Sequence, residues 1–118
     1  MFQVVKIGEK DIEMLAMASV DGYYKSIFGV DPLKLQQSLD NDDSAGAIEF
    51  VQKMGFVMAK FAELKDRKEM LKLNEGAFWE WMDQFSRIDY MNALGDIRKV
   101  YDGEKIVTSK EKKRTSAK

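Results

Sequence analysis

The sequence predicts a mainly α-helical fold: one small domain of four or five helices, with an N-terminal β-hairpin and a disordered basic C-terminal tail. Three observations support this prediction. Apolar residues recur at three- and four-residue spacing through most of the chain. Two short segments near its start flank a glycine, and lysines are concentrated near its end. A length of 118 residues is enough for one domain, placed at residues 1–103, followed by a flexible tail at residues 104–118.

Residues 3–7 and 11–16 are predicted to pair as the two strands of the hairpin. The first segment is rich in β-branched residues, and Gly8-Glu9-Lys10 separates it from the second. A glycine between two short segments of this kind is typical of a tight turn.

Two short helices are predicted next. Residues 20–28 have helical spacing of their apolar side chains, and Gly29 follows where a left-handed C-cap is expected. Asp31 before Pro32 is typical of a helix start, because aspartate caps free backbone N–H groups and proline suits the first helical position. This second helix is expected to continue to Asp40.

The longest periodic stretch predicts a central core helix that runs to about residue 65. Either Asp43 or Ser44 is expected to cap its start. Its apolar stripe consists of Ala47, Phe50, Val51, Met54, Met58, Phe61 and Ala62. The charge-rich residues 66–73 are either the frayed end of this helix or a loop, and a mobile connection is the favoured interpretation.

Two further helices follow. Asn74 is expected to cap the first of them, in which Phe78, Trp81, Met82 and Phe85 share one face. Trp79 lies about 100° from Phe78 around the helix axis, so it is off that face. Ser86 is expected to cap the last helix, which ends before Gly103. The side chains of this helix that are expected to face the core are Ile88, Met91, Leu94, Ile97 and Tyr101.

The chain contains no histidine and no cysteine. Without cysteine it has no disulfide, no thiolate nucleophile and no cysteine-ligated metal centre. Without histidine it lacks the usual general base near neutral pH and the commonest transition-metal ligand. We therefore expect a non-catalytic protein without a cofactor. A carboxylate-dependent enzyme ranks last among the candidate functions, because it needs Asp or Glu clustered in a pocket and the acidic residues of this sequence are scattered.

The acidic segment at residues 40–43 partly matches the opening of a calcium-binding loop. Asp40, Asp42 and Ser44 occupy alternate positions, but Ala45 stands where that loop needs glycine and Val51 where it needs glutamate. Helix capping is the favoured interpretation, and no metal site is expected.

Several apolar side chains are candidates for an interface. Met54, Met58, Met82 and Met91 either line an adaptable peptide groove or fill ordinary core, and core is favoured. Trp79 is the better candidate because it lies off the buried stripe, with burial inside the monomer as an equal alternative.

Nucleic acid and membrane are not expected partners. The tail holds six basic and two acidic side chains but no aromatic residue for base stacking, and the first 103 residues hold 13 basic and 18 acidic ones. No apolar run approaches the roughly 20 residues that span a bilayer, and the start of the chain lacks the apolar core of a signal peptide. We therefore expect a cytoplasmic protein.

Four segments carry a family resemblance. Residues 23–31 (YYKSIFGVD) look like a tyrosine-containing helix that ends in a Phe-Gly-x-Asp turn, and residues 48–60 (IEFVQKMGFVMAK) look like a central helix. Residues 78–85 (FWEWMDQF) look like a Trp-Leu-x-x-Phe helix with Met82 in the leucine position, and residues 88–101 look like a closing helix. In this order and spacing, residues 3–103 resemble the small tail assembly chaperones of long-tailed, siphovirus-type bacteriophages, especially those that infect Gram-positive hosts.

The resemblance implies a chaperone that binds the apolar tape measure protein, keeps it soluble and promotes polymerisation of the tail tube around it. It places the protein in the host bacterial cytoplasm and not in the mature virion. Many copies on one long partner gain avidity, so self-association is expected. The partner-binding side chains under this interpretation are Tyr23, Tyr24, Met58, Trp79, Met82 and Tyr90.

In many such phages a programmed frameshift near the end of the gene yields a longer form that engages the tail tube protein. The codons GAA-AAA-AAG for Glu111, Lys112 and Lys113 would contain a slippery heptamer. The basic tail is therefore a candidate frameshift or linker region.

The alternative from another class is a small acidic adaptor or inhibitor that binds one host or phage protein complex. Its acidic body would act as a charged decoy. This alternative predicts one tight, stoichiometric partner, whereas the chaperone hypothesis predicts many copies on each tape measure chain.

Overall fold

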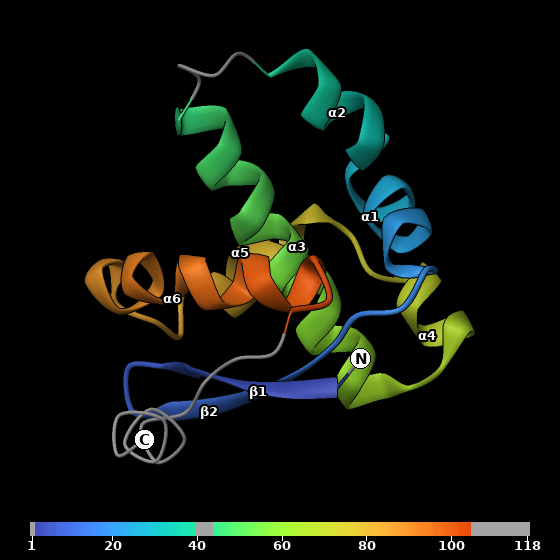
Figure 1. Cartoon of the computed structure of the whole chain (residues 1–118). Helices are drawn as coiled ribbons and strands as arrows, with labels where there is room; N and C mark the ends of the chain where they lie inside the picture. The colour runs from blue at the N-terminus through green and yellow to red at the C-terminus, as the bar shows by residue number, and fades with distance from the viewer. Residues whose placement is uncertain (1, 40–43, 105–118) are drawn as a thin grey trace, which may run out of the picture.

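The computed structural model describes residues 2–39 and 44–104, and it confirms a mainly helical fold with an N-terminal antiparallel hairpin (Figure 1). The predicted tail, apart from Glu104, lies outside the described residues, as do the predicted cap Asp43 and the rest of the acidic segment. The elements are β1 (Phe2–Ile7), β2 (Lys10–Leu15), α1 (Val20–Phe28), α2 (Pro32–Ser38), α3 (Ser44–Leu64), α4 (Arg67–Leu71), α5 (Glu75–Met82) and α6 (Arg87–Tyr101).

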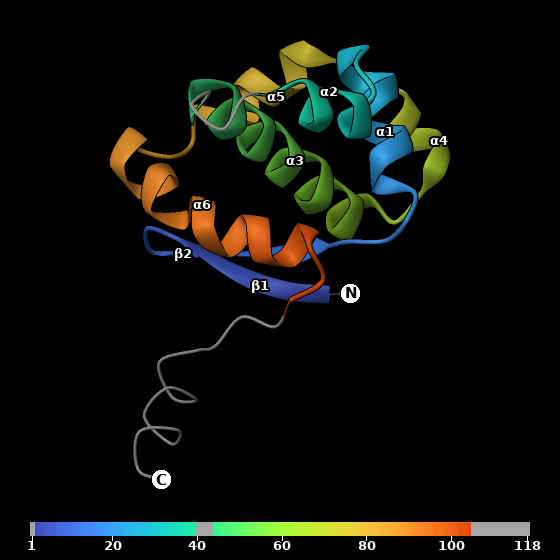
Figure 2. The same cartoon turned by 45° about the horizontal axis from the view of Figure 1, so that its top comes forward.

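Helix α3 runs through the middle of the molecule, and the other elements pack around it. The hairpin forms a layer on one side, where β2 contacts α3 and β1 contacts α6 (Figure 2). Helices α1, α4 and α5 contact other parts of the α3 surface. This arrangement surrounds the middle of α3 and leaves its first turns beside the start of α6.

The hairpin has a two-residue turn at Gly8 and Glu9, where Gly8 adopts a φ of 65° that favours glycine. Its side chains alternate between two faces, as the strand repeat requires. Val5, Ile7 and Met14 point into the core and are at most 1% exposed. The prediction of a hairpin at this position is confirmed.

The first two helices begin and end as their local sequence predicts. Gly29 closes α1 with a left-handed φ of 74°. The Asp31 side chain accepts a hydrogen bond of 2.9 Å from the backbone N–H of Leu33, and Pro32 occupies the first turn of α2. Helix α2 ends at Ser38, slightly earlier than predicted.

Helix α3 is buried over more of its circumference than the predicted stripe. Phe50, Met54 and Met58 are buried as predicted, but Ala47 is exposed, so its assignment to the stripe is wrong. Phe56 and Val57, which lie outside the stripe, are fully buried. The reason is that the hairpin, α1, α5 and α6 contact this helix from several directions.

The predicted mobile connection at residues 66–73 contains a short helix, α4, so that interpretation is corrected. Lys65 ends α3 with a φ of 51°, and the Asp66 side chain then accepts from the backbone N–H groups of Lys68 and Glu69 at 2.8 and 3.4 Å. Met70 is fully buried and anchors the helix to the core. The described residues thus contain six helices instead of four or five.

The predicted caps of α5 and α6 are confirmed. Asn74 accepts from the backbone N–H of Ala77 at 3.0 Å, and Ser86 accepts from that of Asp89 at 3.2 Å. Ile88, however, is 61% exposed, so its predicted inward position is wrong. The buried stripe of α6 is rotated relative to the prediction and consists of Tyr90, Ala93, Ile97 and Val100.

A chain of hydrogen bonds joins α6 to α1 and α2. The Tyr101 hydroxyl donates to Asp21 Oδ1 at 2.8 Å and accepts from Gln36 Nε2 at 3.3 Å. Burial, together with the bond to Asp21, raises the pKa of Tyr101 to about 12. Burial and then the charge of Glu49 raise the pKa of Tyr24 to about 12.

These raised pKa values predict loss of stability in alkali. The two hydroxyls ionise near 10 when the chain is unfolded but only near 12 when it is folded. Folding therefore favours the protonated hydroxyls. Their contribution to the free energy of unfolding is complete below about pH 10 and is lost as the pH rises towards 12. The two shifts correspond to at most roughly 5 kcal/mol. Solvent screening at the partly exposed Tyr101 reduces this, so urea unfolding should show a free energy of unfolding lower by on the order of 2–4 kcal/mol at the alkaline end. The Tyr101→Phe variant should show a smaller alkaline loss, and an equal loss would contradict this assignment.

Candidate functional site

Four of the six predicted partner-binding side chains lie in the core. Tyr23, Tyr24, Met58 and Tyr90 are at most 5% exposed, so the expectation that they form part of an exposed surface is corrected. They fill the space between α3 and the helices around it, and of the four only Met58 had been given core as the favoured interpretation. The remaining two differ: Trp79 is 57% exposed, and Met82 is partly exposed.

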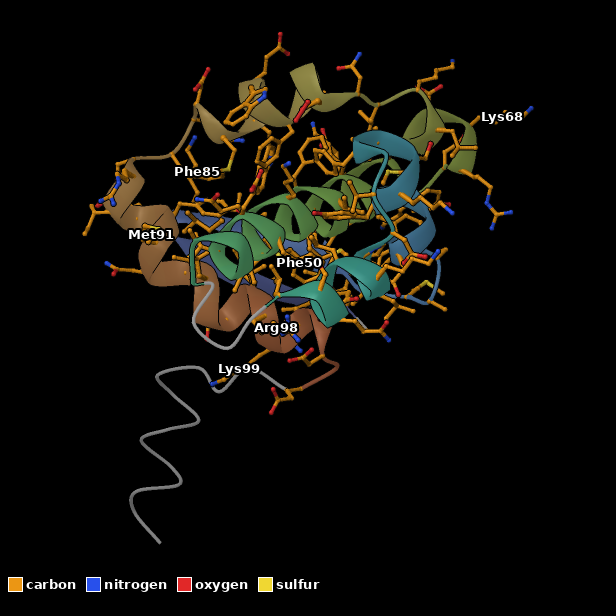
Figure 3. The ribbon with its side chains drawn as sticks, turned by 90° about the horizontal axis from the view of Figure 1, so that it is seen from above. Phe50, Lys68, Phe85, Met91, Arg98 and Lys99 are labelled. Atoms are coloured by element: carbon orange, nitrogen blue, oxygen red, sulfur yellow. The ribbon has the colours of Figure 1, made fainter. Side chains whose placement is uncertain are left out.

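Met82 lies in an apolar groove of about 430 Å³ where the start of α3, the end of α5 and the start of α6 meet. Figure 3 shows Phe85 and Met91 together at this end of the molecule. Of the four methionines considered for a peptide groove, Met82 and Met91 line this one, whereas Met54 and Met58 are core. The apolar walls are Ala45, Ile48, Met82, Phe85, Tyr90 and Met91.

A tight connection between α5 and α6 brings these walls together. The backbone N–H of Phe85 donates to the carbonyl of Met82 at 3.1 Å, which turns the chain directly after α5. Ser86 then caps α6 and sets its direction. Phe85 therefore lies in the turn between the helices and not on the last turn of α5, where the sequence pattern placed it.

Tyr90 forms the floor of the groove and fixes α6 to α3. Its hydroxyl donates a 2.9 Å hydrogen bond to the backbone carbonyl of Gln52. Its ring packs near Phe85 and Trp81, with ring centroids 5.6 and 5.7 Å away. Burial raises the pKa of Tyr90 well above its usual value, so the hydroxyl stays protonated and remains a donor.

Gly55 allows α6 to come close enough to α3 for the Tyr90 hydrogen bond. A Cβ atom at this position would lie 2.6 Å from the Tyr90 hydroxyl and 3.2 Å from Cγ2 of Ile97. Glycine in the middle of a helix costs roughly 1 kcal/mol relative to alanine, so a specific contact must offset that cost. The close packing of α6 against α3 at Gly55 is that contact.

Two exposed apolar side chains lie outside the groove on α5 and α6. Ile88 is three residues before Met91 and therefore extends the apolar surface along the same side of α6. The ring of Trp79 lies tilted against that of Phe78, with the centroids 5.0 Å apart, and more than half of the side chain is exposed, as are Glu75 and Glu80 on the same helix. Large exposed aromatic side chains are common anchors at protein interfaces.

The groove offers apolar contact more than reactive groups. Its polar lining comes from Gln52, Ser86, Arg87 and the Tyr90 hydroxyl. In residues 2–39 and 44–104, no group of three or more acidic side chains is arranged to hold a metal ion. Within the same ranges, no helix has both the length and the apolar character needed to cross a bilayer.

Comparisons with known proteins find no match to this chain among protein-family models, curated proteins or solved structures.

Sequence reasoning missed Ile48 and Arg87 as groove residues. Ile48 lies outside the predicted stripe of the central helix, and a single arginine at a helix start carries no periodic signal. Met91 was already a groove candidate by sequence, but its position beside α3 was not predicted.

The Gly55 contact predicts opposite effects for two glycine-to-alanine substitutions. Gly55→Ala should lower the free energy of unfolding by about 1–3 kcal/mol, because the new methyl group overlaps the Tyr90 hydroxyl. Gly95→Ala, where nothing lies within 4 Å of the new Cβ, should raise it by about 0.5–1 kcal/mol through helix propensity. Urea unfolding of both variants measures the difference.

A third variant keeps this prediction specific. Tyr90→Phe removes the overlapping hydroxyl, so Gly55→Ala should cost less in that background than in the original chain. Equal costs in the two backgrounds would mean that the contact with the Tyr90 hydroxyl does not fix α6 to α3.

Proposed function

We propose that this protein is a non-catalytic tail assembly chaperone of a siphovirus-type phage, which binds the tape measure protein and promotes polymerisation of the tail tube around it. The observation that carries the proposal is the apolar groove with Met82 and Met91 on its walls and Ile88 beside it. Apolar side chains left outside the core on a chain that is 33% charged suit a protein that covers another apolar surface.

The groove suits an apolar helix of the partner. A helix places apolar anchors at positions i, i+3, i+4 and i+7, and such a row fits a groove between helices. Methionine side chains are unbranched and adapt to different partners, so one groove can accept successive, unequal segments of a long chain. Adaptability of this kind is what a protein that coats a long helical partner requires.

Trp79 gives a second contact region away from the groove residues on α6. Contacts between copies and with the same long partner would reinforce one another through a high effective concentration. In this proposal the chaperone self-associates along the tape measure protein in the host cytoplasm and leaves before the virion is complete. A longer frameshifted form would engage the tail tube protein.

The proposal is tested first by the gene and its neighbourhood. A slippery heptamer at the codons for Glu111 to Lys113, an overlapping −1 frame and a very long helical reading frame downstream are the expected findings. Codons that cannot slip would remove the frameshifted form, and an unrelated gene neighbourhood would contradict the chaperone function.

Co-expression with the protein encoded by that long reading frame tests the function itself. We expect the chain to keep this protein soluble, with several copies bound to each partner chain as measured by sedimentation. Met82→Asp and Met91→Asp should each reduce the soluble partner at least tenfold, because a carboxylate in the groove loses its hydration against apolar side chains.

Leu33→Asp is the matched control, since Leu33 is 56% exposed on α2 and lies outside the groove. It should leave the soluble fraction unchanged. Equal losses in all three variants would contradict a role for the groove, and one bound copy per partner would favour the adaptor alternative.

A further inference from the structure

We infer that the groove selects an apolar helix that carries a carboxylate, and that Arg87 binds this carboxylate at the groove edge. The inference rests on the proposed function for the apolar part of the site and adds a charge requirement to it. The carrying observation is an arginine without a partner beside an apolar groove.

Arg87 lines the groove and is exposed. It forms no hydrogen bond or ion pair with another residue in the described ranges. The other two arginines in those ranges do have partners: Arg98 pairs with Asp102 at 3.0 Å, and Arg67 donates to the Tyr23 hydroxyl at 3.4 Å. The guanidinium group of Arg87 is thus available to a ligand.

The positive charge of Arg87 is not balanced by the helix to which it belongs. It is the first residue of α6, where the positive end of the helix dipole disfavours a cation. Asp89, the acidic residue of that first turn, lines a separate hollow with Gly8 and Lys10 and is absent from the groove lining. A carboxylate brought by a partner would be attracted both by the guanidinium group and by the helix dipole.

Two oxygen atoms of the other polar lining residues already accept hydrogen bonds. The carbonyl of Gln52 accepts from Tyr90, and the Ser86 hydroxyl oxygen accepts from the backbone N–H of Asp89. Among the residues that line the groove Arg87 alone is charged, and Met82, Phe85 and Met91 are apolar neighbours on that lining. Its fork of N–H groups matches a carboxylate in a bidentate pair, which is stronger than a neutral hydrogen bond.

The occupant with this chemistry is an amphipathic helix with apolar anchors one turn apart and a glutamate or aspartate at the end that meets Arg87. Its apolar row would cover Met82, Phe85 and Met91, and the partial exclusion of water would strengthen the ion pair at the edge. A wholly apolar helix would bind more weakly, and one with lysine at that end would be rejected by like charge.

Charge reversal across the interface tests this inference. The probes are three acetylated and amidated helical peptides with the same leucine row, which carry glutamate, glutamine or lysine at the end facing Arg87. Calorimetry with the whole chain should show the glutamate peptide binding about tenfold or more tightly than the lysine peptide. Arg87→Glu should reverse this preference, and Arg67→Glu, a charge reversal outside the groove, should leave it unchanged.

A further variant separates the chain's own carboxylates from that of the peptide. Asp40, Asp42 and Asp43 lie outside the described residues but close in sequence to Ala45 on the groove wall. The triple variant Asp40→Asn, Asp42→Asn, Asp43→Asn should keep the preference for glutamate. A preference that emerges only in this variant would overturn the inference, because Arg87 would then serve the chain itself.

The outcomes also separate this inference from the proposed function. Equal binding of the three peptides overturns the charge requirement and leaves an apolar binding groove. Failure of all three peptides to bind, with the co-expressed partner still kept soluble, overturns the groove as the site of selection but not the chaperone function.

Discussion

The contact between Gly55 and Tyr90 is the constraint on which the arrangement of α3 and α6 depends. Because Gly55 has no side chain, the Tyr90 hydroxyl reaches the carbonyl of Gln52 and brings the start of α6 against α3. The ring of Tyr90 then supports Phe85 in the turn that leads out of α5. One small residue in the central helix thus fixes three elements and the groove between them.

The groove lies where α3 is least covered by the other elements. The middle of α3 is covered on several sides, so Phe56, Val57 and Met58 are fully buried. The first turns of α3 have fewer neighbours, and there Ile48, Met82 and Met91 remain partly exposed. Partly exposed apolar residues that surround one hollow are the feature that links this fold to binding another protein.

The fold could be predicted where local chemistry decides it. Side-chain caps at Asp31, Asn74 and Ser86 and the left-handed Gly29 depend on neighbouring residues, and these were predicted correctly. Burial depends on which elements meet in space, and spacing along one helix does not specify that. For this reason Ile88 was placed inside, Phe56 was overlooked and the tyrosines were assigned to a surface. No sequence pattern predicted that Arg87 lines the groove, because its position there depends on neighbouring residues of two other helices.

Binding of a partner helix in the groove can be observed by methyl NMR. The eight methionines can be labelled with ¹³C at their methyl groups and observed while a fragment of the proposed partner, a tape measure protein, is added. We expect large chemical shift changes for Met82 and Met91, and small ones for the buried Met54 and Met70. Shifts confined to Met17, which is exposed on the connection between β2 and α1, would contradict binding in the groove and place the partner elsewhere.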